Sequence, residues 1–551
     1  MSPATSRRAF VASGAASLLI LRGVPRIGLR RAPYDLVIRG GNVFDGIAAA
    51  AVESDVAIAG GTIAAVARRI AERGTEEIDA RGLAVAPGFI DIHSHGDGSL
   101  AADPRAESLI RQGVTTIVAG QDGSSRAPAG ARAGADTAGD AASFTSLFSG
   151  IEALHPAVNV ASMVGLGTLR GIVVGEDNRA ATPGELARMT AMVENALAQG
   201  ACGASSGLEY TPGAFAPLDE LIALCKPLAL RRLPYATHMR NEDDRVLEAI
   251  DESIAVARGA GCPLEISHLK TEGPRNWNRL DAAFARIAAA RQNGVDVTFD
   301  RYPYLAYSTG LTNLFAAASR DGGTDAFLAR LTDASSAQRL RAEALDKIEL
   351  LGGWDNIMIV SVRAPEDKAA EGKRLGAYAK SLGKDPYALA VEMLGRNRAN
   401  VSMVGFAMSE DNLERILAHP QSMVCSDGGA FAIDGPTRRG SPHPRGLGTF
   451  PRVLGRYVRE RKTLTLAQAI NKMSGMPAAR LRLAGRGRLA AGYSADVVVF
   501  DPATVQDMAT YEQPFQYPVG IGVVVVNGAV ALRDGQRVGG GRGKAVRPGG
   551  G

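Results

Sequence analysis

The sequence has few cysteines, no long apolar run and no excess of one charge. Its four cysteines are scattered without a C-x-x-C pair, which argues against a disulfide framework and indicates packing residues. No stretch is long and apolar enough to predict a membrane span, so we expect no stable membrane association. The formal charge of +5 depends on six arginines in residues 1–32, a segment without acids, and without them it is −1. The charge balance therefore predicts no nucleic-acid partner.

The N-terminal segment contains Arg7 and Arg8 followed by a modest apolar run to Leu21. This pattern resembles a twin-arginine export signal, and we expect residues 1–33 to be a leader. The protein is then expected in the periplasm or secreted. The alternative is a cytoplasmic protein with a basic leader.

Two segments far apart in the chain show the same pattern of short predicted strands separated by Gly/Asn turns. They are residues 34–86 and 481–535, and together they predict one small composite β domain built from both chain ends. The Gly/Arg-rich residues 536–551 are expected to form a disordered tail.

The middle of the chain, residues 87–480, alternates short apolar runs with amphipathic stretches. This alternation of strand and helix patterns predicts an α/β fold in which parallel strands form a (β/α)8 TIM-like barrel. The eight runs are 88–92, 114–118, 158–164, 201–205, 233–237, 263–267, 295–300 and 422–426. The long stretch between the last two runs predicts a helical insert at about residues 310–400.

Two histidines, His93 and His95, end the first of these runs. Side chains at i and i+2 of a strand point to the same face, so both imidazoles are expected to converge on one point. Neutral imidazoles that converge are typical ligands of a divalent metal such as zinc.

Other reactive side chains follow the later strands, at the barrel end where active sites lie. They are Asp122 after the second strand, Glu209 and Tyr210 after the fourth, His238 and His268 after the fifth and sixth, and Asp427 after the eighth. Four of only seven histidines occupy these strand ends. The pattern predicts a metal site with Asp427 in a catalytic position opposite the histidines.

The motifs together resemble the amidohydrolase superfamily and, within it, the N-acyl-D-amino-acid deacylases, also called D-aminoacylases. The resemblance covers about residues 34–535. It is carried by residues 87–95, 113–116, 206–213, 237–242, 266–270, 302–304, 426–428 and 443–456. The first motif marks only the superfamily, whereas the last several together are specific to the branch.

The resemblance implies a metal-dependent hydrolase that removes the acyl group from N-acyl-D-amino acids or cleaves a related amide of a D-residue. It also implies one or two divalent ions, with zinc expected. By it, His93 and His95 form one metal position, and His238 and His268 form the other. The family's bridging ligand after the second strand is a cysteine, and this sequence has Asp122 there. A carboxylate can bridge two metals and is a harder ligand than a thiolate. Glu209 is a second candidate bridge.

The resemblance also implies how a small-molecule N-acyl amino acid would be held and cleaved. Asp427 is expected to take a proton from the attacking water and to deliver it to the leaving amine. The substrate carboxylate is expected to meet Lys270, Tyr210 and Arg438. Lys270 has local support because it lies two residues after His268.

Two alternatives stay open. A cyclic-amide hydrolase of the hydantoinase or dihydroorotase kind would carry a bridging lysine after the fourth strand, and residues 203–213 contain none. A non-catalytic scaffold with this fold would be expected to lack ligands or the acid after the eighth strand, and both are present. The sequence does not specify the oligomeric state.

Overall fold

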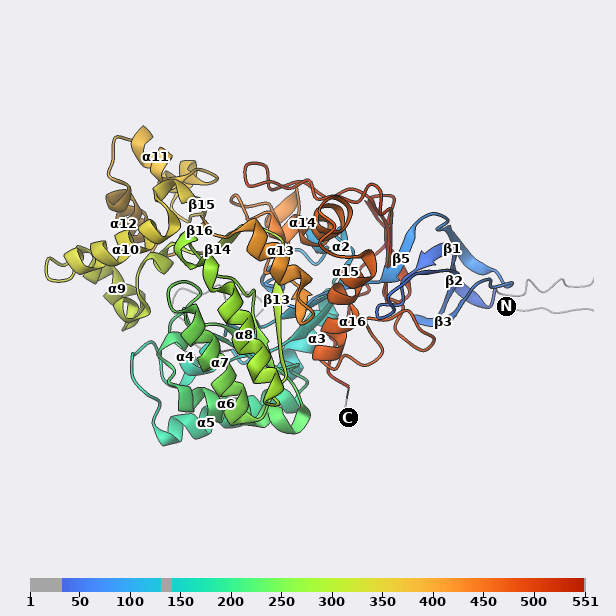
Figure 1. Ribbon diagram of the computed structural model, residues 1–551, viewed down its shortest axis with the longest axis horizontal. Helices are drawn as coiled ribbons and strands as arrows, with labels where there is room; N and C mark the ends of the chain where they lie inside the picture. The colour runs from blue at the N-terminus through green and yellow to red at the C-terminus, as the bar shows by residue number, and fades with distance from the viewer. Residues whose placement is uncertain (1–31, 130–140, 550–551) are drawn as a thin grey trace, which may run out of the picture.

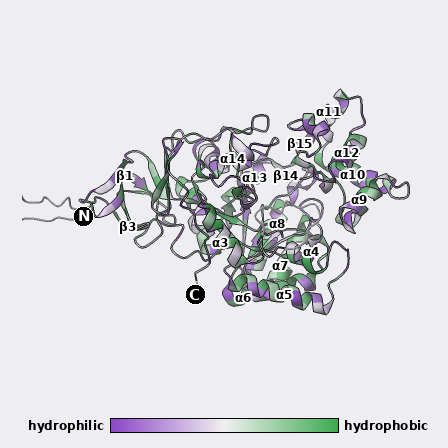
Figure 2. Ribbon diagram, turned by 180° about the vertical axis from the view of Figure 1, so that it is seen from behind, coloured by the Kyte–Doolittle hydropathy of each residue, from purple (hydrophilic) through white to green (hydrophobic). Residues whose placement is uncertain are grey.

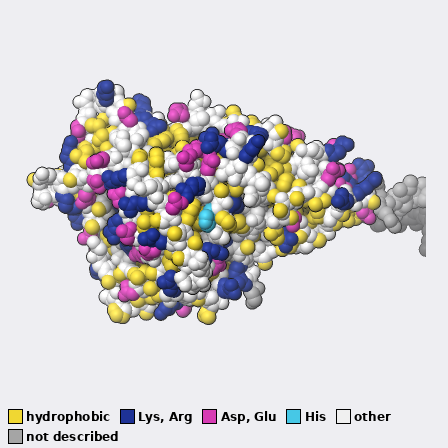
Figure 3. Space-filling view, viewed as in Figure 1, with side chains coloured by type: hydrophobic (Ala, Val, Ile, Leu, Met, Phe, Trp, Pro, Cys, Tyr) yellow, Lys and Arg dark blue, Asp and Glu magenta, His cyan; other side chains and the backbone are white. Residues whose placement is uncertain are grey.

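The structure is a computed structural model that describes residues 32–129 and 141–549. A β domain lies at one end of the molecule, an α/β barrel lies in the middle, and a lobe of helices projects from the other end (Figure 1). The expected leader, residues 1–33, lies almost wholly outside the described residues. No helix of the described part is long and apolar enough to cross a membrane. Basic and acidic side chains are interspersed over the face seen in Figure 3.

Strands from both chain ends form one sheet of the β domain, as predicted. The order is β21-β20-β19-β18-β5-β1-β2-β3, and β4 also pairs with β1. The two ends meet where β18 pairs antiparallel with β5. The strands are β1 Tyr34–Val43, β2 Val52–Ala59, β3 Thr62–Ala67, β4 Gly74–Asp79, β5 Ala84–Pro87, β18 Val497–Phe500, β19 Ile521–Val526, β20 Ala529–Arg533 and β21 Gln536–Arg537.

The barrel contains the eight predicted strand positions in the predicted order. Its strands are β6 Phe89–Asp91, β7 Val114–Ala119, β8 Asn159–Ser162, β9 Val164–Gly165, β10 Ala204–Gly207, β11 Tyr235–His238, β12 Leu264–Ile266, β13 Val297–Arg301 and β17 Ser422–Val424. The third predicted run is divided into β8 and β9. The Met163 N–H donates to the Ala119 carbonyl at the end of the second strand, β7. The next residue pairs on the other side, because the Val164 N–H donates to the Gly203 carbonyl just before the fourth strand, β10.

The barrel closes between its first and last strands through backbone contacts at the site end. The Asp427 N–H donates to the His93 carbonyl at 2.8 Å, and the His95 N–H donates to Gly428 at 2.9 Å. The buried Asp91 carboxylate accepts the Ser426 N–H at 2.8 Å. The segment with His93 and His95 is therefore fixed directly to the segment that carries Asp427.

Helices surround the strands of the barrel (Figure 1), and several of them carry both hydrophilic and hydrophobic residues (Figure 2). They are α3 Phe144–Leu154, α4 Leu166–Val173, α5 Pro183–Ala198, α6 Leu218–Arg231, α7 Val246–Ala260, α8 Leu280–Gln292, α13 Glu410–Ala418, α14 Arg445–Arg452, α15 Leu466–Met473 and α16 Gly475–Arg480. Thr182 and Glu185 form the capping box that starts α5. Short helices α1 Asp97–Leu100 and α2 Glu107–Ile110 follow the first strand.

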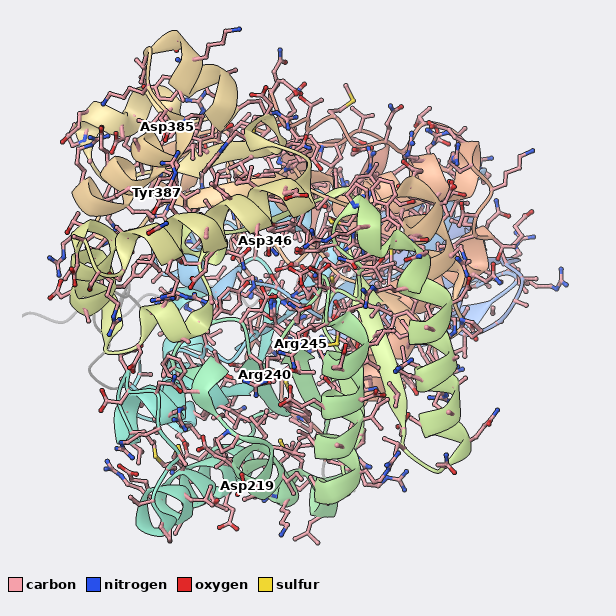
Figure 4. The ribbon with its side chains drawn as sticks, turned by 60° about the vertical axis from the view of Figure 1, so that its left-hand side comes forward. Asp219, Arg240, Arg245, Asp346, Asp385 and Tyr387 are labelled. Atoms are coloured by element: carbon pink, nitrogen blue, oxygen red, sulfur yellow. The ribbon has the colours of Figure 1, made fainter. Side chains whose placement is uncertain are left out.

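The insert after the seventh strand contains a small sheet as well as the predicted helices. Strands β14 Ala306–Gly310, β16 Ser402–Phe406 and β15 Ile357–Ser361 pair antiparallel, and the helices are α9 Gly323–Thr332, α10 Ala337–Leu351, α11 Leu375–Ser381 and α12 Pro386–Arg396. Asp385 and Tyr387 lie at the outer end of this lobe, while Asp346 on α10 faces the barrel side near Arg245 (Figure 4). Lys347 joins the lobe to the barrel through Asp243 and Glu272, at 2.8 and 3.3 Å.

The prediction of a disordered tail at residues 536–551 is wrong for residues 536–549. The Gly543 N–H donates to Pro156 at 2.8 Å, and the Val546 N–H donates to Val160 at 2.9 Å. Gly543 allows this approach, because a Cβ there would lie 2.0 Å from the Val158 carbonyl oxygen. Composition could not predict that this segment is ordered, because backbone hydrogen bonds, and not burial of apolar side chains, hold most of it.

Candidate metal centre

The predicted ligands come from different strands and meet at one end of the barrel. His93 and His95 follow β6, Asp122 follows β7, His238 ends β11 and His268 follows β12. Because the strands are parallel, their carboxyl ends share one rim. Asp427, after β17, completes the group from the adjacent last strand.

Asp122 lies between the two histidine pairs. Its Oδ1 is 3.4 Å from His93 Nε2 and 3.6 Å from His268 Nε2, and its Oδ2 is 3.4 Å from His95 Nε2. His268 Nε2 lies 3.1 Å from His238 Nδ1. The carboxylate is thus placed to bridge two ion positions, one on each histidine pair.

Glu209, the other candidate bridge, lies at the edge of the centre. Its Oε2 is 3.5 Å from His238 Nε2. Among the described residues it comes within 4 Å of no other histidine. The geometry therefore favours Asp122 over Glu209 for a bridging role.

The donor atoms fit a divalent ion. His93 Nε2, His238 Nε2 and Asp122 Oδ1 are buried and lack a hydrogen-bond partner among the described residues. Buried polar atoms without partners are costly, so several that converge on one point indicate a bound species. One ligand atom from each of His93, Asp122, His268 and Asp427 lies within 4.8 Å of the others. Imidazole and carboxylate donors in such a group suit zinc.

The backbone at three of these residues adopts a conformation that is uncommon for side chains with a Cβ. Asp122, His268 and Asp427 have φ values of 51°, 37° and 49°. Residues in the left-handed region are strained and persist where their surroundings fix them. The strain occurs at three of the converging side chains, which is consistent with a functional constraint.

Gly207, at the end of β10, makes room for the Asp122 loop. A Cβ at this position would lie 2.2 Å from the Asp122 carbonyl oxygen, a backbone atom that cannot move without the loop. We expect Gly207→Ala to reduce bound metal and to lower the free energy of unfolding by about 1–3 kcal/mol, measured by metal analysis and denaturation. Gly184→Ala is the control, because nothing lies within 4 Å of its Cβ. Wild-type metal content and stability in Gly207→Ala would contradict this role.

Asp427 contacts both the histidines and a buried arginine. Its Oδ1 is 3.2 Å from His95 Nε2, and its Oδ2 is 2.7 Å from Arg445 Nη1. Burial raises the pKa of Asp427, but Arg445 and the nearby histidines outweigh this effect and hold the pKa below its ordinary value. The carboxylate is therefore ionised, which is the state that a proton acceptor must have before the reaction begins.

Sequence reasoning missed Arg445, although it belongs to the motif at residues 443–456. The guanidinium also lies over the Tyr302 ring, 4.7 Å from its centroid. His443 positions it, since its Nδ1 accepts the Arg445 N–H at 3.0 Å while its Nε2 donates to Ala306 at 2.9 Å. The signal was an arginine two residues after a histidine, in the segment that follows the eighth strand.

Arg445 neutralises Asp427 inside the protein, which gives a testable prediction. We expect Arg445→Met to lower the free energy of unfolding of the metal-free protein by about 3–5 kcal/mol, because a buried charge loses its partner. Adding Asp427→Asn should restore part of this loss in a double-mutant cycle measured by denaturation. The exposed Arg438→Met is the control. Additive effects of the two site substitutions would contradict the pairing.

Glu242 is a second residue that sequence reasoning missed, within the motif at residues 237–242. Its Oε1 lies 3.0 Å from His268 Nδ1, and both of its oxygens lie 2.6 Å from Lys270 Nζ. A histidine that binds a metal through Nε2 carries its proton on Nδ1, where a carboxylate orients it. Glu242 is positioned for that supporting role toward His268.

The three expected substrate-binding residues are placed differently. Lys270 and Tyr210 line the cavity over the metal centre, and the Tyr210 hydroxyl lies 3.2 Å from Thr309 Oγ1. Arg438 is exposed, lies over the Phe515 ring, and does not line the cavity. The structure therefore does not bring Arg438 together with the other site residues.

The cavity has a volume of about 430 Å³ and opens over the converging ligands. Its wall contains His95, Asp122, His238, His268 and Asp427 together with residues of the insert, among them Tyr307 and Asn313. The insert thus forms part of the wall of this cavity.

Comparison with known proteins agrees with this architecture. The family model described as "Amidohydrolase family" matches residues 76–532. A D-aminoacylase from Alcaligenes xylosoxydans xylosoxydans is 37% identical over 505 residues, which cover 90% of this chain and 94% of the relative. An N-acyl-D-glutamate deacylase from the same organism is 38% identical, with 90% and 93% covered.

Solved structures give the same assignment. The crystal structure of an N-acyl-D-glutamate deacylase from Bordetella bronchiseptica, complexed with zinc and a phosphonate inhibitor, is similar with a TM-score of 0.81 at 36% identity. The match covers 93% of this chain and 99% of that one. An L-hydantoinase from Arthrobacter aurescens, with a TM-score of 0.55 at 16% identity, shares the fold. The chain belongs to the amidohydrolase family.

Proposed function

We propose that this protein is a metal-dependent amide hydrolase that removes the acyl group from N-acyl-D-amino acids. The observation that carries the proposal is the ionised Asp427 carboxylate beside four converging histidines, at the base of one cavity. The similarity to curated deacylases over nine-tenths of the chain supports the substrate class.

The ion-binding residues are His93, His95, His238 and His268, with Asp122 between the pairs. A zinc ion bound there supplies polarisation of the amide carbonyl and activation of water near neutral pH. Asp427 accepts a proton from the attacking water while the water oxygen bonds to the carbonyl carbon of the amide. The same carboxyl group then gives that proton to the amine nitrogen as the C–N bond breaks.

The remaining residues orient these groups and the substrate. Arg445 holds one oxygen of Asp427, and the other oxygen lies beside His95. Tyr210 and Lys270 are within the cavity wall and supply donors for the substrate carboxylate. Arg438 stays a prediction that requires movement of its exposed segment.

The experiment that tests the proposal is a panel of N-acetyl-D-methionine, N-acetyl-L-methionine, hydantoin and dihydroorotate, assayed with the zinc-loaded protein. We expect hydrolysis of the D-amide to exceed that of every other substrate. Preferred hydrolysis of hydantoin or dihydroorotate would support the cyclic-amide alternative, and no hydrolysis in the presence of bound zinc would support a scaffold. Against the cyclic-amide alternative, residues 203–213 supply no lysine and Glu209 contacts only His238 among the histidines.

We also infer that residues 1–33 direct export through the twin-arginine pathway. A reporter fused to this segment is expected in the periplasm, and replacement of Arg7 and Arg8 by lysine is expected to leave at least about nine-tenths of it in the cytoplasm. Replacement of Arg30 and Arg31 is the matched control. Equal export of both variants would contradict the inference.

A further inference from the structure

The cavity wall carries more carboxyl groups than the metal centre uses. Besides Asp122 and Asp427, its carboxylates are Glu176, Glu209, Glu242 and Glu272. The only lysine and arginine in the lining are Lys270 and Arg445, and each lies within 2.7 Å of a carboxylate. Lys270 is assigned to the substrate's own carboxylate and Arg445 is paired with Asp427. No further lysine or arginine of the described cavity lining is therefore left to receive an acidic side chain of a substrate.

Glu209 is the acid closest to the metal centre that lacks a cationic partner. Its side chain is 14% exposed, and its Oε2 accepts a hydrogen bond from Asn313 Nδ2 at 3.0 Å. Arg320 donates at 2.6 Å to the backbone carbonyl of Glu209 and not to its carboxylate. No lysine or arginine of the described part of the chain comes within 4 Å of the Glu209 carboxylate.

Glu176 lies in the same wall and also has no ion pair among residues 32–129 and 141–549. Burial raises its pKa, and Thr211 is its hydrogen-bond partner. Glu272 contributes to the wall as well, and shares Lys347 with Asp243. Together, Glu176, Glu209 and Glu272 form what we call the acidic wall.

Tyr307 gives an independent indication that a polar group binds here. Its side chain lines the cavity and is 6% exposed, and its hydroxyl lacks a hydrogen-bond partner within the described structure. The pKa of Tyr307 is raised well above its ordinary value by burial and then by the charge of Glu272. An unpartnered buried hydroxyl beside carboxylates is suited to accept a hydrogen bond from a cationic donor.

We propose that the substrate of this cavity carries a positively charged group that binds the acidic wall. The proposal rests on the proposed function and narrows its substrate class. The charge can come from the side chain of a D-lysine or D-arginine residue, or from the free amino group of an aminoacyl group, which would make the substrate a dipeptide with a C-terminal D-residue. An acidic side chain is disfavoured, because it would be buried against carboxylates without a cation.

The experiment compares kcat/KM for three pairs of substrates that differ in charge but little in shape. The pairs are N-acetyl-D-lysine with N-acetyl-D-norleucine, glycyl-D-alanine with N-propionyl-D-alanine, and N-acetyl-D-glutamate with N-acetyl-D-glutamine. We expect the cationic member of the first or the second pair to be favoured by about 10- to 100-fold, the range for hydrogen bonds to a charged group. The favoured pair identifies the source of the charge. Glutamate is expected to fall at least about 10-fold below glutamine.

Substitution of the wall then tests whether it causes the preference. In Glu209→Gln or Glu176→Gln, we expect the ratio of kcat/KM for the cationic to the neutral substrate to fall at least about 10-fold. The exposed Glu366→Gln is the matched control and should keep the wild-type ratio. Hydrolysis of neutral and cationic substrates at equal rates, or a ratio unchanged in both wall variants, would overturn this inference alone. If no N-acyl-D-amino acid or dipeptide is cleaved, the proposed function itself fails.

Discussion

Asp427→Asn is expected to lower kcat by about 10³- to 10⁴-fold while bound metal stays near the wild-type level. The amide is almost isosteric with the carboxylate but cannot accept the proton of the attacking water, and positioned acid–base catalysis contributes an effect of up to this size. The four histidines and Asp122 remain as ligands in this variant. The measurement is kcat with N-acetyl-D-methionine together with metal content in the same preparation.

The matched control is Asp385→Asn, at the exposed outer end of the insert lobe (Figure 4). It makes the same chemical change far from the strand ends that form the site and should leave kcat unaltered. Loss of metal together with activity in Asp427→Asn would show that Asp427 is chiefly a ligand. Full activity would remove it from the mechanism.

His268→Ala is expected to lower metal affinity by more than about 100-fold. Even residues that only support a ligand are worth 10- to 100-fold in metal affinity, and His268 is a ligand that contacts both Asp122 and His238. Its Nδ1 partner Glu242 would also lose the group that it orients. Metal retained after dialysis against a buffered zinc series provides the measurement, with activity recorded at each zinc concentration.

His419→Ala is the control for this experiment. His419 lies outside the barrel against Phe284 and Phe299, where burial lowers its pKa, and it contacts no residue of the metal centre. Its removal should leave metal affinity unchanged, although packing is lost. Retention of the wild-type affinity in His268→Ala would exclude His268 from the centre.

The barrel and most of the centre could be predicted from the sequence because their signals are local. A parallel strand buried on both faces appears as a short apolar run, so each of the eight strands was visible in isolation. The i, i+2 spacing of His93 and His95 predicted that their side chains converge, as side chains do in a strand, although both residues lie just after the end of β6. Parallel strands then place the residues that follow them on one rim, which brought His238, His268 and Asp427 into the same prediction.

Residues whose roles depend on the path of a loop could not be predicted in this way. Arg445 reaches Asp427 only because His443 bridges the start of α14 and the strand β14. Glu242 lies beyond the end of β11, and its contacts with His268 and Lys270 come from a different strand. Arg438 illustrates the reverse case, since the family resemblance predicted it as a site residue while its own loop leaves it exposed.

The choice of the bridging acid is a question that the sequence left open and that the geometry answers in favour of Asp122. Two acids, Asp122 and Glu209, were comparable candidates for the bridge. Only Asp122 reaches both histidine pairs, and its loop is held by the approach of Gly207. Glu209 is then available for the role in substrate charge recognition that we propose.

The most direct test of the central claim is a crystal structure of the zinc-loaded protein with anomalous diffraction recorded at the zinc absorption edge. The account predicts at least one peak at about 2.0–2.1 Å from imidazole nitrogens of His93 and His95 or of His238 and His268, with Asp122 as a further ligand. A protein that binds no zinc, or a peak away from these side chains, would contradict it.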